Sequence, residues 1–74
     1  MTRRQFAPRF PRPTPEAILA ARTAAGHTQE QAARAVYCGL RSWKRWESGE
    51  GPMPPAAWVL YLLRTGQTTL EALD

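Results

Sequence analysis

The sequence predicts an all-α domain, a compact bundle of four helices followed by a short C-terminal turn. Apolar residues recur at steps of three and four, which is the period of a helix with one buried face. Capping residues, glycines and prolines mark where each helix begins and ends. The 74 residues allow one domain with a modest core, and chains of this size often gain stability by dimerising.

Residues 1–13 differ from the rest because they hold three prolines and show neither a helical nor an alternating period. Proline fixes φ and removes a backbone donor, so we expect a flexible, basic, proline-rich arm here. All of its arginines precede the first acid of the chain, Glu16: Arg3, Arg4, Arg9 and Arg12. Residues 14–74 are then expected to form the folded domain.

The first helix is expected to run from Pro15 to about Ala25. Thr14 supplies a capping hydroxyl, and proline is favoured at the first helical position. Gly26 supplies the left-handed residue that ends many helices.

The second helix is expected from Gln29 to about Val36. Thr28 and Gln31, three residues apart, predict a capping box at its start. Tyr37-Cys38-Gly39 then predicts a tight turn before the next helix.

The third helix is expected from about Leu40 to Glu47. Trp43 and Trp46 lie three residues apart and match a buried stripe. This orientation leaves a cationic set on the outer face: Arg41, Lys44 and Arg45. Such a helix suits insertion into a DNA major groove.

The last segment begins after a loop over residues 48–54, and Pro55 is expected to open a fourth helix that Gly66 ends. The helix is apolar on most sides, which predicts burial in the core and against something further. Thr68 or Thr69 is expected to cap a final short turn. We expect this C-terminal region to form a dimer surface, with these candidates: Trp58, Tyr61, Leu62, Leu70 and Leu73.

The overall charge favours a polyanionic partner. The formal net charge is +4, with the cations gathered in the arm and in the third helix, which is the distribution expected of a nucleic-acid-binding domain. Cys38 is the only cysteine, so no internal disulfide is possible and a reducing cytoplasm fits. No apolar run is long enough to span a membrane, and no secretory signal is recognisable.

Catalysis is not expected. Beside the lone His27 and Cys38 there is no cluster of cysteine, histidine and carboxylate residues suited to a metal or a nucleophile. We therefore expect no enzyme activity, no metal and no cofactor.

A set of residues between Arg22 and Gly49 follows a known pattern: Arg22, Gly26, the opening Thr28-Gln29-Glu30, Ala33, Val36, Cys38, Trp43 and the closing Trp46-Glu47-Ser48-Gly49. On these residues the chain resembles the Cro/CI (XRE-type) helix-turn-helix family of DNA-binding proteins, over roughly residues 15–66. More narrowly, Arg41-Ser42-Trp43, the closing Trp46-Glu47-Ser48-Gly49 and the proline-led apolar helix after them are similar to the small anti-CRISPR-associated (Aca) repressors of phages.

The resemblance implies a role for each matching position. Base edges are expected to be contacted by Leu40, Arg41, Lys44 and Arg45, with Arg41 the foremost guanine reader and Lys44 better suited to a phosphate. Phosphates are expected to be contacted by Thr28, Gln29 and Ser42. The arginines of the arm are candidates for the DNA backbone or minor groove.

Two further expectations come from the family pattern. Arg22 and Glu47 are expected to form a buried ion pair, although Arg22 could instead contact a phosphate. The family usually has glycine where this chain has Tyr37, so we expect a positive φ at a tyrosine, at a cost of about 1 kcal/mol. Gly39 could alternatively rewire the turn.

The function expected from these observations is sequence-specific binding of double-stranded DNA by a transcriptional regulator. The resemblance favours a repressor, autoregulating a phage or mobile-element operon in the cytoplasm of a bacterial host and associated with the nucleoid when bound. We expect a homodimer on a palindromic operator, with neither a small-molecule effector nor a membrane partner. The alternatives are an antitoxin-type module that neutralises a protein partner through the arm, and an RNA-binding protein.

Overall fold

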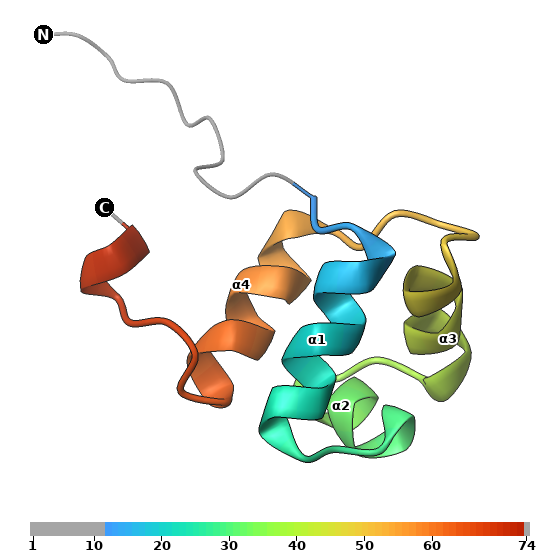
Figure 1. The fold of residues 1–74 in the computed structure, drawn as a ribbon, viewed down its shortest axis with the longest axis horizontal. Coiled ribbons are helices and arrows are strands. Elements are labelled where there is room, and N and C mark those ends of the chain that lie inside the picture. Colours follow the sequence, from blue (N-terminus) through green and yellow to red (C-terminus); the bar gives the residue numbers. More distant parts are fainter. Residues whose placement is uncertain (1–11, 74) are drawn as a thin grey trace, which may run out of the picture.

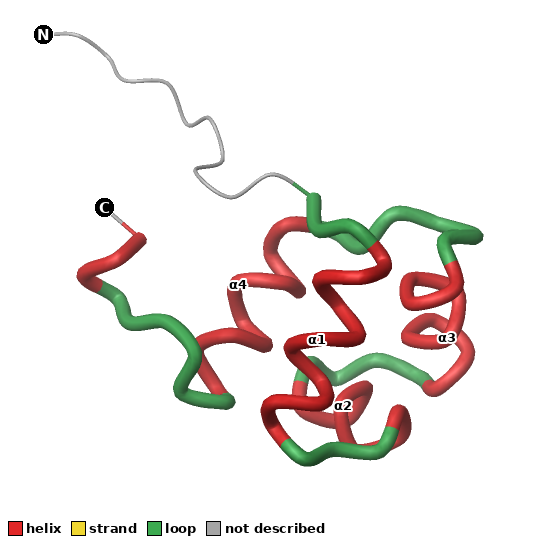
Figure 2. The backbone as a smooth tube through the Cα atoms, in the orientation of Figure 1, coloured by secondary structure: helices red, strands yellow, loops and turns green. Residues whose placement is uncertain are grey.

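The computed structural model describes residues 12–73, and its fold is all-α (Figure 1). Helices and loops make up this part of the chain, which contains no strand (Figure 2). The elements are α1 (Pro15–Ala25), α2 (Gln29–Ala35), α3 (Leu40–Ser48), α4 (Pro55–Arg64) and the 3₁₀ turn η1 (Glu71–Leu73). The prediction of four helices and a short C-terminal turn is confirmed.

The start and end of α1 follow the local sequence. The Thr14 hydroxyl accepts a hydrogen bond from the Ala17 amide at 3.1 Å, and Pro15 begins the helix. Gly26 ends it with a φ of +72°, a conformation that costs a residue with a Cβ about 1–2 kcal/mol. Both boundaries match the prediction.

A capping box begins α2. The Thr28 hydroxyl accepts from the Gln31 amide at 3.1 Å, and the Gln31 side chain accepts from the Thr28 amide at 2.8 Å. The helix ends at Ala35, one residue earlier than expected, because the following Val36 leaves the helical region with φ −118° and ψ 19°.

The turn between α2 and α3 keeps its positive φ at Tyr37, at +59°. Gly39 instead lies in an extended conformation, with φ −79° and ψ 160°, and caps α3. The turn is therefore not rewired around Gly39. It closes with a hydrogen bond from the Cys38 amide to the Ala33 carbonyl at 2.9 Å.

The core lies where α1, α2, α3 and α4 converge. Trp43 and Tyr61 are its two largest fully buried side chains, and their ring centroids lie 4.9 Å apart. Each such ring removes roughly 150–250 Å² from water, so two of them dominate a small core. Within residues 12–73 the buried core residues are Ile18, Ala21, Ala32, Ala33, Val36, Trp43, Met53 and Tyr61.

Met53 is a core residue that the sequence analysis assigned only to a loop. Its side chain is fully buried, although Pro52 and Pro54 flank it and no helical period surrounds it. The loop between α3 and α4 is consequently anchored in the core at one point.

The four helices surround this core with α1 across the middle of the view, α3 on one side of it and α4 on the other (Figure 1). The second helix packs against both α3 and α4, and α1 packs against α3. None of the helices within residues 12–73 has the length and apolar character needed to cross a membrane.

The burial of α4 corrects one expectation. Tyr61 is fully buried in the core and has no surface to offer to a second protomer, so its assignment to a dimer interface was wrong. Trp58 and Leu62 pack against the core and remain partly accessible, while Leu70 is 71% exposed. Leu73 lies in η1, and its side chain is outside the described part of the structure.

Candidate nucleic-acid interface

The third helix presents two opposite faces. Trp43 is fully buried, and Trp46 packs partly buried against the core. Since successive helical residues are separated by about 100°, a helix fixed by these two indoles directs its cationic residues outward. Its exposed cations are Arg41, Lys44 and Arg45.

Hydrogen bonds among Arg22, Trp43 and Glu47, here called the polar lock, hold the inner face of α3 in this orientation. The indole Nε1 of Trp43 donates to Oε1 of Glu47 at 2.8 Å, one turn further along the same helix. The Trp43 ring also meets Trp46 edge to face, with centroids 5.9 Å apart. Trp43 and Glu47 both belong to α3, so their hydrogen bond fixes the indole against the carboxylate. Rotation of α3 about its axis would move both indoles out of the core.

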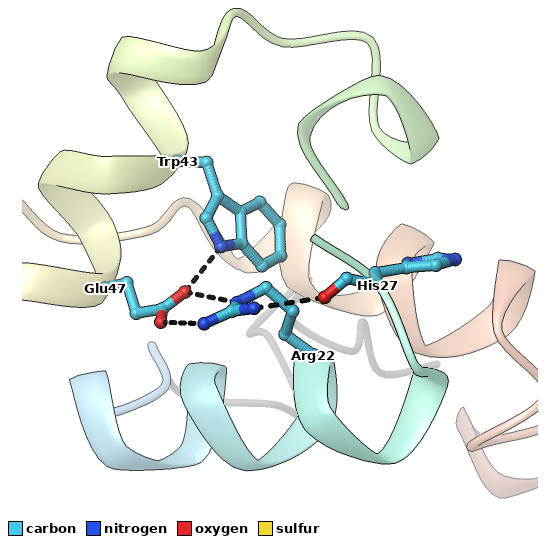
Figure 3. Close-up of polar contacts among 4 residues, drawn as sticks. All are labelled: Arg22, His27, Trp43 and Glu47. Carbon is cyan, nitrogen blue, oxygen red and sulfur yellow. Dashed lines mark hydrogen bonds and ion pairs between the residues drawn. The ribbon is translucent and has the colours of Figure 1, made fainter. Parts of the chain in front are cut away.

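The lock continues into α1 through an ion pair (Figure 3). Arg22 donates from Nε to Oε1 of Glu47 at 2.9 Å and from Nη2 to Oε2 at 2.8 Å. A third bond runs from its Nη1 to the backbone carbonyl of His27 at 3.0 Å. The ion pair expected between Arg22 and Glu47 is therefore present, and Arg22 makes three hydrogen bonds within the fold.

The contact between Arg22 and Glu47 shifts the pKa of both groups. The hydrogen bond from Arg22 is the main cause that lowers the pKa of Glu47; burial opposes it, and the Trp43 indole and, more weakly, Gln29 add to the lowering. The same hydrogen bond raises the pKa of Arg22. The pair therefore stays ionised at neutral pH.

His27 has a partner that the sequence analysis did not anticipate. Its Nδ1 lies 2.8 Å from the Tyr61 hydroxyl, and the two rings meet edge to face. Burial raises the pKa of Tyr61, so the hydroxyl stays neutral and available for this bond. Together with Arg22, His27 ties the segment between α1 and α2 to the core.

The outer face of α3 forms one side of an open hollow. Leu40, 37% exposed, stands at its start. The sequence analysis did not assign two of the lining residues, Ser48 and Glu50, to the site. The three-residue step from Arg45 to Ser48, which keeps both on one helix face, was the available signal. The full lining is Leu40, Arg41, Lys44, Arg45, Ser48 and Glu50.

The residues expected to contact phosphates lie on two elements. Thr28 is exposed at the start of α2, and Gln29 is half-buried beside it. Ser42 is half-buried on α3. The amides of Gln29 and Glu30 and the Thr28 hydroxyl proton are donors suited to an anion, whereas the Gln31 amide already donates to the Thr28 oxygen.

The arm can be placed only at its last arginine. Arg12 is exposed just before α1. Arg3, Arg4 and Arg9 lie outside the described residues.

Comparison with known proteins agrees with this architecture. Residues 11–74 match a family model described as a helix-turn-helix domain, a span that includes every helix described above. A search of curated proteins gave no match. The turn at Tyr37 joins two short helices, of which the second carries the exposed cations. On this evidence, the chain belongs to the helix-turn-helix domain family.

Proposed function

We propose that the protein is a sequence-specific, double-stranded DNA-binding transcriptional regulator that inserts α3 into the major groove. The observation that carries the proposal is the two-faced α3, with Trp43 fully buried and Arg41, Lys44 and Arg45 exposed. A helix held this firmly can present a fixed set of donors to the groove, which admits a single α-helix.

Base reading is assigned first to Arg41. It lies in the first turn of α3, and the N-terminal residues of a recognition helix are those that contact base edges. Its planar guanidinium matches O6 and N7 of guanine, the commonest base-specific contact. Leu40 is proposed to touch a thymine methyl group, and Lys44 to offer a point charge to a phosphate or a base.

The start of α2 is proposed to contact the phosphates of the DNA backbone. Backbone amides converge there and favour an anion. Thr28, Gln29 and, on α3, Ser42 add side-chain donors to the same task. These contacts set the register of the protein on the duplex, while the base contacts select the sequence.

A homodimer on an inverted repeat completes the proposal. One protomer offers a single short recognition helix, whereas two related by a twofold axis offer two helices about 34–36 Å apart, one turn of duplex. The proposed contact surface comprises the accessible parts of Trp58 and Leu62 and the exposed Leu70 and η1 segment.

The biological role we propose is repression by occupancy. A dimer bound across a promoter excludes polymerase without needing an effector. The resemblance to anti-CRISPR-associated (Aca) repressors favours autorepression of a phage or mobile-element operon. Such a regulator acts in the cytoplasm of the bacterial host and is nucleoid-associated when bound.

A selection from random duplexes on the purified protein tests the proposal. We expect enrichment of one inverted repeat with a fixed half-site spacing, and affinity that falls steeply with salt as phosphate contacts release counterions. Enrichment of no sequence, or of structured RNA over duplex DNA in direct competition, would refute it, since the A-form major groove is too narrow for a helix.

A further inference from the structure

The guanidinium of Arg45 lies over the backbone of Gly51, in the loop that follows α3. A methyl group on Gly51 would meet Nη2 of Arg45 at 2.9 Å, Cζ at 3.4 Å and Nε at 3.7 Å. These three nearest atoms all belong to the guanidinium of one side chain. Of the three exposed cations of α3, Arg45 is therefore directed toward the loop that follows the helix.

The loop is fixed to the same residue through the main chain. The Arg45 carbonyl accepts hydrogen bonds from the Glu50 amide at 2.9 Å and from the Gly51 amide at 3.3 Å. The Ser48 hydroxyl donates to it as well, at 3.1 Å. The position of Gly51 relative to α3 is thus determined by the loop itself, independently of the Arg45 side chain.

Backbone conformation does not require glycine at position 51. Positive φ values occur at Gly26, Gly49 and Gly66 but not at Gly51. What a side chain at position 51 would disturb is the space that Arg45 occupies. An alanine there is compatible with the fold and conflicts only with the observed position of the guanidinium.

We propose that Gly51 is a positioning residue for Arg45, and that Arg45, so placed, contacts the phosphodiester backbone and not a base edge. This inference rests on the proposed function. Base edges are reached from the N-terminal part of a recognition helix. Arg45 lies one turn beyond Arg41, and its guanidinium lies against the loop that follows α3. A guanidinium presents paired donors that suit phosphate oxygens. The missing Cβ of Gly51 leaves this position beside the loop open to the guanidinium before binding.

A double-mutant cycle on the full chain tests the proposal. Wild type, Arg45→Ala, Gly51→Ala and the double variant are titrated by fluorescence anisotropy against the selected operator and a scrambled duplex, each over a range of salt. Arg45→Ala should weaken both duplexes equally, by about tenfold or more, and reduce the salt slope by about one. Gly51→Ala should weaken both by a smaller factor, and should have no further effect when Arg45 is already alanine.

Two results would overturn the inference while leaving the proposed function intact. One is loss of operator preference in Arg45→Ala, which would make Arg45 a base reader. The other is an equal effect of Gly51→Ala with and without Arg45, which would show that Gly51 acts through something else. If wild type itself prefers no duplex, the proposed function fails, and the inference fails with it.

Folding is checked separately by thermal melts. Wild type is the reference, because Gly51 lacks a positive φ and an added methyl group there conflicts only with the Arg45 guanidinium. Gly51→Ala should melt as wild type does. A Gly51→Ala melt clearly below it would assign the binding loss to misfolding and overturn the positioning role.

Discussion

Arg64, at the end of α4, holds the exposed Tyr37 of the turn between α2 and α3. Its Nη1 donates to the Tyr37 hydroxyl at 2.8 Å, and its Cζ lies 5.2 Å from the centre of the ring. Tyr37 is 78% exposed and has a φ of +59°, so burial does not stabilise it there. The contact with Arg64 offsets part of the strain in the turn.

Tyr37→Gly should therefore change stability little in the wild-type chain. Glycine relieves about 1 kcal/mol of backbone strain, while the lost cation–π contact, at an exposed site, is worth about 0.5–1 kcal/mol. In an Arg64→Ala background the same substitution should stabilise by about 1 kcal/mol. Urea denaturation of the four proteins measures this, and identical effects in both backgrounds would show that the two residues are not coupled.

Glu47→Ala should be among the most destabilising single changes. It leaves Arg22 without its carboxylate in a partly buried site and removes the acceptor of the Trp43 indole. We expect a loss of about 3 kcal/mol in the free energy of unfolding. The matched control is Glu30→Ala, which breaks a 3.4 Å pair with Arg34 on the surface and should cost less than about 1 kcal/mol. Similar losses in the two variants would contradict the role given to the lock.

Stability should fall in acid because of the same carboxylate. The folded-state pKa of Glu47 is lowered, chiefly by its hydrogen bond from Arg22. Its contribution is therefore fully present above the unfolded-state pKa, near pH 4–5, and is lost as pH falls through the lower folded-state value. Urea denaturation at a series of pH values below about 5 should show a shallower acid dependence in Glu47→Gln than in wild type. An identical slope for Glu47→Gln would refute this origin.

Arg41→Ala should remove sequence preference, whereas Lys44→Ala should weaken all DNA alike. A bidentate guanine contact discriminates by about 1–3 kcal/mol, and a phosphate contact does not discriminate. Anisotropy titrations on the selected operator and on a scrambled duplex separate the two. Equal losses on both duplexes from Arg41→Ala would exclude it as the base reader.

Leu70→Glu should shift the protein toward monomer without unfolding it. Leu70 is 71% exposed, so its replacement removes little from the core of one protomer. Sedimentation velocity should show weaker self-association than in wild type, and binding to the full inverted repeat should weaken more than binding to a half-site. Leu19→Glu is the matched control on α1, since Leu19 is also exposed, at 45%. Unchanged self-association in Leu70→Glu would remove this residue from the proposed dimer surface.

The helices were predictable because their signals are local. Thr14 and Thr28 form the caps expected of them, and Gly26 ends α1 as expected. The inward orientation of Trp43 followed from its spacing to Trp46, because a three-residue step keeps two side chains on one helix face.

The features that were predicted wrongly or missed depend on contacts between elements that are distant in the sequence. The fourth helix is apolar on most sides, so periodicity did not select its inward face, and Tyr61 was assigned to the wrong surface. Met53 lies between two prolines and carries no period, and only the folded loop places it in the core. The approach of Arg45 to Gly51 likewise depends on how the loop returns over α3, which residue spacing does not specify.

The lock among Arg22, Trp43 and Glu47 has an evolutionary consequence. Its hydrogen bonds all lie on the hidden flank of α3, so exchange of the solvent-side residues leaves the scaffold undisturbed. During evolution, substitutions at a few outward positions of α3 can therefore change the target while the hydrogen bonds of the interior are kept.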